Sequence, residues 1–305
     1  MKIAVVGSYG VGLTMRVPKV PAPGETVSGG TFHEGPGGKG SNQAIGAARL
    51  GAEVSLLTAI GDDAFGKSAH ALWIAEGIDT THVVTTSSAT MVGFILVDPA
   101  GENCISIAPG ALDTLDEASV EPFRSAIAEA DIVVLSMEIP LPAVMAALRI
   151  ARTVGTRTLL NPAPAQLLPD ELWSLVDVIT PNQTEAPVLL GLAPDHGLSD
   201  QQLVTELRQR TGGIAILTRG SDGALISDAN GSSEVPAQRV EHVVDTTGAG
   251  DSFTAALAVA LAEGQQLTAA TAFAAAAGAH AVTIAGVIPS LPTRDQLLSK
   301  IGSTR

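Results

Sequence analysis

Hydrophobic residues along the chain fall into two alternating patterns: short β-branched runs and longer segments with helical periodicity. The short runs predict buried strands, and the longer segments predict helices. This alternation is typical of βαβ units, so we expect a mostly parallel sheet covered by helices on both faces. The predicted strands span residues 3–7, 54–60, 132–135, 158–160, 178–180, 214–218 and 224–227, and the helices between them residues 41–50, 64–76, 142–154 and 201–210.

The pattern changes after about residue 228. A polar turn at residues 228–233 and a short strand at 239–244 precede two alanine-rich helices, 250–263 and 267–282. The sequence contains no internal repeat and no long linker between this part and the rest. We therefore predict one α/β domain over residues 1–305.

Two segments interrupt the βαβ rhythm. Residues 12–34 alternate like short strands around a turn rich in Pro and Gly, and residues from about 89 to 110 do so around a second turn at 98–101. They are either two unrelated surface hairpins or one small β-sheet lid assembled from both pieces. We favour the lid, because loops beside the sheets of α/β proteins often close over a site.

Composition narrows the class of protein. Hydrophobic residues make up 46% of the chain, enough for a large core, and 17 Lys and Arg against 31 Asp and Glu give a net charge of −14. This acidity argues against a nucleic-acid or anionic-membrane surface, which needs clustered positive charge. The single cysteine, Cys104, excludes an intramolecular disulfide framework and a cysteine-based zinc site. The apolar runs are too short for an export signal or a membrane span, so we expect a soluble cytoplasmic protein.

Residues 61–68 match the P-loop pattern of nucleotide-binding proteins, with two glycines followed by Lys67 and Ser68. Two carboxylates, Asp62 and Asp63, lie inside this segment and would repel the phosphates that a P-loop binds. An aspartate at the start of a helix is better explained as an N-cap. We therefore interpret the segment as an ordinary strand-to-helix turn.

Small residues precede the predicted helix at 250–263, in the order Gly248, Ala249, Gly250 and then Asp251. Their backbone N–H groups can approach an anion closely, and the start of a helix adds partial positive charge. Asp251 would repel that anion unless it acts as a base, accepting the proton of a hydroxyl that attacks a phosphoryl group. The alternative is a glycine-rich turn in which Asp251 is an ordinary first-turn carboxylate.

Three other segments carry candidate chemistry. In the glycine-rich residues 35–44, Lys39 suits a phosphate and Asn42 suits sugar hydroxyls, unless the segment is simply a flexible loop. Asn182 and Glu185 are three residues apart, a spacing that suits either a hydrated Mg²⁺ or a local helix cap. Residues 218–223 either border a nucleotide or form a β-turn.

The order of these motifs resembles the ribokinase-like, or PfkB, family of carbohydrate kinases. Residues 37–43, 161–165, 182–185 and 245–251 carry the resemblance, with support from 23–27 and 61–63. The similarity extends over essentially the whole chain. The resemblance implies a Rossmann-like three-layer α/β/α core and a small β-sheet lid that often forms a homodimer contact. It also implies ATP-dependent phosphorylation of a hydroxyl of a small sugar, with Mg²⁺ and usually K⁺.

The resemblance assigns roles by position. Asp251 matches the catalytic base, and Gly248, Ala249 and Gly250 match the anion hole. The other matching positions are Gly38, Lys39, Asn42 and Glu138 for the sugar, Asn182, Thr218, Gly220, Ser221 and Gly223 for the nucleotide, Glu185 for the Mg²⁺ region, and Asp245, Thr247, Ala281, Ile284, Gly286 and Ser290 for the monovalent cation.

One departure concerns the sugar. Ribokinases that resemble this chain carry Asn and Asp after the first strand, and these side chains bind sugar hydroxyls. Here Gly10 and Gly12 occupy the two positions. A site without such groups loses the discrimination that they provide. We expect the space to admit a bulkier substituent on the acceptor, with Tyr9 contributing to binding instead.

Three functions remain open on the sequence. The acceptor is a ribose-type pentose or related sugar in the first, and a nucleoside, modified sugar or polyol in the second. In the third the chain is a non-catalytic sugar-binding sensor, which Asp251 argues against because a sensor has no use for a base.

Overall fold

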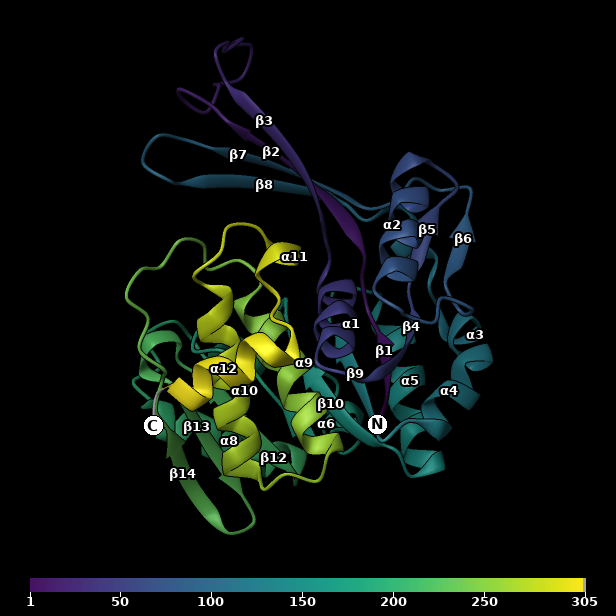
Figure 1. Ribbon diagram of the computed structural model, residues 1–305, viewed down its shortest axis with the longest axis vertical. Coiled ribbons are helices and arrows are strands. Elements are labelled where there is room, and N and C mark those ends of the chain that lie inside the picture. The colour runs from purple at the N-terminus through teal and green to yellow at the C-terminus, as the bar shows by residue number, and fades with distance from the viewer. Residues whose placement is uncertain (304–305) are drawn as a thin grey trace.

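An eight-stranded sheet forms the centre of the computed structural model, which describes residues 1–303 (Figure 1). The strand order is β14-β13-β12-β11-β10-β9-β1-β4, and neighbours from β4 to β12 run parallel. This confirms the predicted α/β class; residues 304 and 305 of the predicted domain lie outside the described part. The strands are β1 (Lys2–Val6), β4 (Glu53–Leu57), β9 (Ile132–Ser136), β10 (Arg157–Asn161), β11 (Val178–Ile179), β12 (Ile214–Thr218), β13 (Ala224–Asp228) and β14 (Gly231–Val235).

Both faces of this sheet are buried, because alternate residues of each strand enter different hydrophobic cores. In β1, Ile3 and Val5 belong to the first core, and Ala4 and Val6 to the second. The near-continuous apolar runs of the sequence therefore reflect strands covered on two sides.

Helices form a layer on each face, as predicted. None of the helices within residues 1–303 has both the length and the hydropathy needed to cross a membrane. Helices contributing to the first core are α1 (Lys39–Arg49), α2 (Ala64–Ala75), α9 (Ala249–Ala262), α10 (Leu267–Ala281) and α12 (Arg294–Ser303). Those contributing to the second are α3 (Glu117–Val120), α4 (Arg124–Glu129), α5 (Leu141–Val154), α6 (Asp170–Trp173), α7 (Glu185–Leu189) and α8 (Asp200–Thr211).

Two predicted strands and one predicted turn need correction. The expected strand at 239–244 is an extended loop, in which Val243 and Val244 are mostly exposed. The predicted turn at 228–233 is confined to residues 229 and 230, because β13 ends at Asp228 and residues 231–233 already belong to β14, which pairs antiparallel with β13. The run at 54–60 divides at Thr58 into β4 and the short β5 (Ala59–Gly61), which pairs with β6 (Val84–Thr86) in a separate two-stranded sheet.

The two interrupting segments form one small sheet, as predicted for the lid. Its strand order is β3-β2-β7-β8, with β2 and β7 parallel and the outer pairs antiparallel. Figure 1 shows this sheet projecting from the core above the short helix α11 (Val287–Ser290). The strands are β2 (Gly10–Arg16), β3 (Thr31–Gly37), β7 (Val92–Val97) and β8 (Asn103–Ala108).

Residues 61–68, which match the P-loop pattern, form the capped start of a helix. Asp63 is the N-cap of α2 and accepts a hydrogen bond from the backbone N–H of Gly66 at 2.8 Å. Its other oxygen accepts from the backbone N–H of Thr90 at 2.7 Å. The carboxylate therefore fixes the turn between β5 and α2, as expected for a structural aspartate.

Candidate active site

The predicted site residues meet at the carboxyl ends of the parallel strands, where α/β proteins commonly bind ligands. Gly248 is the N-cap of α9 and has a φ of 81°, a left-handed conformation that favours glycine. A Cβ at Gly248 would lie 2.8 Å from Cγ1 of Val287. The N–H of Ala249 donates to the Thr246 carbonyl at 3.3 Å, whereas the next N–H groups at the start of α9 have no carbonyl partner earlier in the helix, so they can bind an anion at this point.

Asp251 lies in the first turn of α9 and is only 7% exposed. The amide of Asn42 donates to Oδ2 of Asp251 at 2.8 Å, and the amide of Gln43 donates to Oδ1 at 3.0 Å. Burial raises the pKa of Asp251, although the charge of Lys39 and the two amides partly oppose this rise. The site thus contains a carboxylate that is more basic than an exposed aspartate.

A close approach of α1 to β1 brings these amides to Asp251. A Cβ at Gly40 would lie 2.5 Å from the carbonyl carbon of Gly7 and 2.6 Å from its Cα. Only glycine therefore permits this contact between the start of the helix and the end of the strand. Gly40 consequently positions Asn42 and Gln43 beside Asp251.

Lys39 and Glu138 form a half-buried ion pair beside Asp251, with 3.4 Å between Nζ and Oε1. The hydroxyl of Ser8 and the backbone N–H of Lys39 both donate to Oε2 of Glu138. Burial alone would lower the pKa of Lys39, but the negative charges of Glu138 and Asp251 outweigh it and raise the pKa. Lys39 is therefore charged in the site.

Sequence reasoning assigned no role to Gln43 and Asn161. The Gln43 amide bridges Asp251 and Oδ1 of Asn161, the second contact at 3.1 Å, and Gln43 is 1% exposed. Two signals pointed to them: Gln43 follows Asn42 directly, and Asn161 begins the Asn-Pro-Ala-Pro-Ala motif after β10. Gln43 contacts the carboxylate directly and Asn161 acts through Gln43, so both are positioning residues for Asp251.

A cavity of about 160 Å³ lies in front of Asp251 and connects the sugar-side and nucleotide-side residues. It brings together predicted site residues from four separate segments of the chain. Its lining comprises Lys39, Asn161, Ala163, Thr180, Asn182, Glu185, Thr218, Gly248, Gly250, Asp251, Phe253 and Thr254.

Asn182 and Glu185 form the local cap that was the alternative explanation for their spacing. The amide oxygen of Asn182 accepts from the backbone N–H groups of Thr184 and Glu185, both at 2.9 Å. The Glu185 carboxylate accepts from the backbone N–H of Asn182 at 2.9 Å. Burial raises the pKa of Glu185, so a cation bound near this carboxylate would relieve an unfavourable buried charge.

The predicted nucleotide loop is a single turn of 3₁₀ helix, η3 (Gly220–Asp222). Gly220 and Ser221 are exposed on this turn, and Thr218 reaches the cavity from the end of β12. Gly223 is different, because it is buried. A Cβ at this position would lie 2.1 Å from the carbonyl oxygen of Val235. Gly223 therefore contacts the β14 region rather than open space.

The predicted cation residues form one loop cluster next to Gly248. Asp245 accepts from the backbone N–H of Thr247 at 2.9 Å and from that of Gly286 at 3.0 Å. Burial would raise the pKa of Asp245, but these hydrogen bonds outweigh it and lower the pKa. Ala281 and Ile284 lie in the same turn, where the Ile284 N–H donates to the Ala281 carbonyl. Ser290 donates to the Val287 carbonyl in the adjoining α11.

The structure corrects the expectation for Gly10 and Tyr9. A Cβ at Gly10 would lie 2.2 Å from Cε of Met91, so a methionine already fills this space. At Gly12 the nearest atom is Cδ1 of Ile95 at 3.7 Å, which leaves room for a small side chain. Tyr9 is buried against Trp73, with ring centroids 5.1 Å apart, and therefore belongs to the core rather than to the site.

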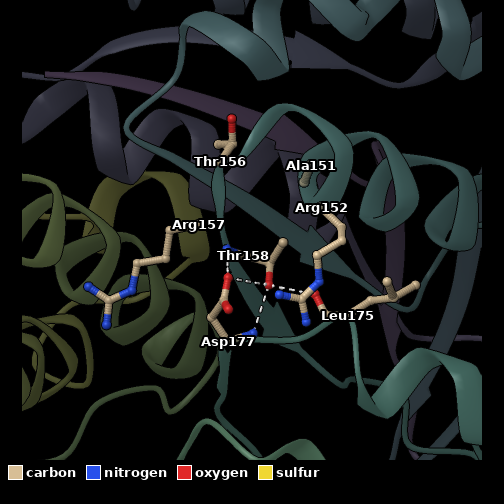
Figure 2. A pocket seen from close by; sticks show the side chains of 8 residues that line it. Ala151, Arg152, Thr156, Arg157, Thr158, Leu175 and Asp177 are labelled. Atoms are coloured by element: carbon tan, nitrogen blue, oxygen red, sulfur yellow. Dashed lines mark hydrogen bonds between the residues drawn. The ribbon is translucent and has the colours of Figure 1, made fainter.

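A larger cavity of about 480 Å³ lies at the opposite, amino-terminal edge of the sheet (Figure 2). Its central polar groups bind each other, since Asp177 accepts from the Thr158 N–H and Thr158 Oγ1 accepts from the Asp177 N–H, both at 2.8 Å. Arg152 donates to the carbonyl of Ser174. We assign the active site to the smaller cavity because it contains Asp251, Lys39 and the start of α9.

Comparison with known proteins identifies the family. The sequence matches the model of the pfkB family carbohydrate kinases over residues 1–294. The chain belongs to this family. A ribokinase from Haemophilus influenzae is 39% identical over 297 residues, covering 97% of each protein. A deoxyribokinase from Salmonella typhi is 33% identical over 298 residues, again covering 97% of each.

A solved structure shows the same fold for this carbohydrate kinase. The ribokinase of Arabidopsis thaliana, solved with ribose and ATP, has a TM-score of 0.91 at 30% identity and covers 98% of this chain and 97% of its own. The family and the ribokinase-like fold that the motif order predicted are thus confirmed. Relatives named for two different acceptors have comparable identity, so the acceptor must be inferred from the site itself.

Proposed function

We propose that this protein transfers the γ-phosphoryl group of ATP to a hydroxyl of a small sugar. The observation that carries the proposal is the buried Asp251 carboxylate beside the N-terminus of α9. A base next to an anion-binding helix start suits attack of a hydroxyl on a phosphoryl group. Relatives named as ribokinases and a deoxyribokinase support a sugar as the acceptor.

In the proposed reaction, the acceptor oxygen attacks the γ-phosphorus and its proton moves to Asp251. The bond between the γ-phosphorus and the oxygen that bridges it to the β-phosphorus breaks, and ADP leaves. The backbone N–H groups near Gly248 and Gly250 stabilise the negative charge on the transferring group. Asn42 and Gln43 hold the carboxylate in place, because they donate to both of its oxygens.

Two cations accompany this proposal. Among residues 1–303 no group of three or more His, Cys, Asp or Glu side chains is placed to hold a metal, which suits a Mg²⁺ bound mainly by phosphates and water. Glu185 is the carboxylate that would hold it within the cavity, and Mg²⁺ would neutralise phosphate charge. Asp245 and the 281–286 turn would hold K⁺, which would add positive charge beside the anion hole.

A screen of ATP consumption with sugars, polyols and nucleosides tests the proposed function. We expect turnover with at least one small sugar and dependence on Mg²⁺. Phosphorylated product would be identified by mass spectrometry. ATP consumption with nucleosides only, or with none of the hydroxylated compounds, would contradict the proposal.

The pH dependence of kcat/KM reports on Asp251. The carboxyl must be deprotonated to accept a proton, and its pKa is raised by burial, so activity should fall as the pH drops through this raised value. Lys39→Met removes a positive charge that lowers the pKa of Asp251. We therefore expect the acid limb of the profile to move to higher pH in this variant. An unchanged midpoint, whatever the change in rate, would show that another group controls the limb.

We also propose that the lid forms a homodimer contact. One face of the lid carries Met15, Phe32 and Phe94, which are 41%, 60% and 56% exposed, and the pairing register places Met15 opposite Phe32. Exposed apolar patches of this kind commonly mark protein interfaces. The occupant that we propose is the same face of a second copy.

Phe94→Glu should therefore convert the dimer into a monomer, because it buries a charge in the contact. Ile74→Glu is the matched control, since Ile74 is 68% exposed on α2, away from the lid. Sedimentation velocity measures both variants. A wild-type monomer, or a Phe94→Glu protein that remains dimeric, would refute this contact.

A further inference from the structure

The cavity of about 480 Å³ at the amino-terminal edge of the sheet has no part in the proposed reaction. Strand β10 separates it from the active site, because Arg157 at the first position of β10 lines this cavity and Asn161 at the last position lines the other. The end of α5 and the segment before β11 complete its wall. A volume of this size is in the range of small-molecule sites. The cavity is therefore a candidate site for a second ligand.

Arg157 is a half-buried cation at this cavity. Its guanidinium makes no hydrogen bond or ion pair with any of residues 1–303. Burial lowers the pKa of Arg157, and the charge of Asp177 opposes this effect only in part. A charged group that loses water without gaining a partner raises the free energy of the folded protein. An anion bound beside Arg157 would supply the missing partner.

Arg152 is the second cation of the cavity, and a backbone contact holds it there. Its Nη2 donates to the carbonyl of Ser174, whereas its Nε and Nη1 have no acceptor within the described chain. Arg152 lies in the last turn of α5, where the carbonyl end of the helix favours a cation, so its presence is explained without a ligand. The same explanation does not apply to Arg157, which begins a strand.

Asp177 lies between the two arginines. Figure 2 shows their guanidinium groups on opposite sides of this carboxylate. Oδ2 of Asp177 accepts from the backbone N–H of Thr158 at 2.8 Å and from its hydroxyl at 3.1 Å, whereas Oδ1 has no partner in the part of the chain that the structure describes. The charge of Asp177 would repel an anion at the centre of the cavity, but Oδ1 can accept a hydrogen bond from a hydroxyl there. The cavity thus offers a cation, a hydrogen-bond acceptor and a second cation in order.

We propose that this cavity binds a second ligand, a small hydroxylated molecule with an anionic group at each end, such as a hydroxy dicarboxylate or a sugar bisphosphate. Arg152 and Arg157 each bind one anionic group, and a hydroxyl between them donates to Oδ1 of Asp177. Arginine suits both kinds of anion, because its planar fork pairs with two oxygens of a carboxylate or a phosphate. This binding is independent of the proposed function, since no group of the active site takes part in it.

Isothermal titration calorimetry of the full chain without ATP tests the site. The probes are L-malate and ribulose bisphosphate, which carry two anionic groups and at least one hydroxyl. Their counterparts with one anionic group are L-lactate and glycerol phosphate. At least one probe should bind about tenfold or more tightly than its counterpart, because the counterpart leaves one arginine unpaired. Binding of malate alone would identify carboxylates as the anionic groups, and binding of ribulose bisphosphate alone would identify phosphates.

Analogues without the central hydroxyl test the contact with Asp177. Succinate replaces malate, and pentanediol bisphosphate replaces ribulose bisphosphate. Loss of a hydrogen bond to a carboxylate should weaken binding by about 10-fold. Equal affinity with and without the hydroxyl would overturn the role of Asp177.

Arg157→Gln distinguishes this cavity from the active site. The substituted side chain makes no hydrogen bond in the described chain, so the variant should keep the stability of the wild type and bind the probes about tenfold or more weakly. The control Arg124→Gln removes the same charge at the start of α4, where Arg124 pairs with Glu121, and should leave binding unchanged.

Three results would overturn the proposal. They are the absence of binding of both probes, equally tight binding of the counterparts with one anionic group, and undiminished binding of the probes by Arg157→Gln. None of them bears on the proposed function, which the screen of ATP consumption tests separately.

Discussion

Asp251→Asn is expected to lower kcat by a factor of about 100 to 10,000, the usual contribution of a general base. The amide cannot accept the hydroxyl proton, although it has nearly the same shape as the carboxylate. It also removes a charge that is costly to bury at a position only 7% exposed, so the variant should fold. Affinity for ATP should remain close to that of the wild type.

Single-turnover kinetics and nucleotide titration together check this expectation. The matched control is Asp228→Asn, which makes the same chemical change at the end of β13. That control should retain wild-type turnover. If Asp251→Asn also retained it, Asp251 could not be the base, and the anion hole would have to act with water or another group as proton acceptor.

Gly248→Ala is expected to lower kcat by about 100-fold, because loss of an anion-stabilising donor costs about 100- to 1,000-fold. The new methyl group would lie 2.8 Å from Cγ1 of Val287, so the start of α9 must move. This movement displaces the backbone N–H groups of Ala249 and Gly250 from the transferring phosphoryl group. The left-handed backbone adds a stability cost of about 1–2 kcal/mol.

Gly264→Ala supplies a close control for this variant. Gly264 follows the other end of α9, has a φ of 77°, and has no neighbouring atom within 4 Å of its Cβ position. It therefore carries the same left-handed cost without the collision or the contact with the site. Urea unfolding should show the left-handed cost in both variants, with a larger total loss of stability in Gly248→Ala because of the collision with Val287, and only Gly248→Ala should lose kcat. Equal kcat values in both would contradict the anion hole.

The buried strands were predictable because both faces of the sheet are covered. The predicted strand at 214–218 has the same bounds as β12. A short, continuous apolar run between two helices is typical of a strand that is buried on both faces of a parallel sheet. β14 escaped prediction because Gly-Ser-Ser-Glu-Val has little apolar character, and backbone pairing with β13 creates the strand. The error at 239–244 has the opposite cause: valines suggested a strand, but no neighbouring strand of the described chain pairs with them.

The site was predictable as a set of motifs but not as a set of contacts. Glycines near the predicted helix starts indicated an anion site, and the presence of a carboxylate at that site indicated a catalytic role for Asp251. The bridge from Gln43 to Asp251 joins residues 208 positions apart, and periodicity carries no information over that distance. The same limit explains the error at Gly10, where the atom that fills the space belongs to Met91. A glycine in the sequence shows that a side chain is absent, but it does not show which other atoms occupy that space.

The lid and the core differ sharply in burial. Every residue of β8 is exposed, whereas every residue of β9 is buried. Segments with few buried contacts open locally at low free energy, while core strands open only with the whole fold. The lid can therefore unfold or swing as a separate cooperative unit, and its amide hydrogens should exchange with solvent long before those of the central sheet. We therefore expect that opening of the lid to admit substrate disrupts only the lid's own contacts and leaves the hydrogen bonds of Asp251 with Asn42 and Gln43 intact.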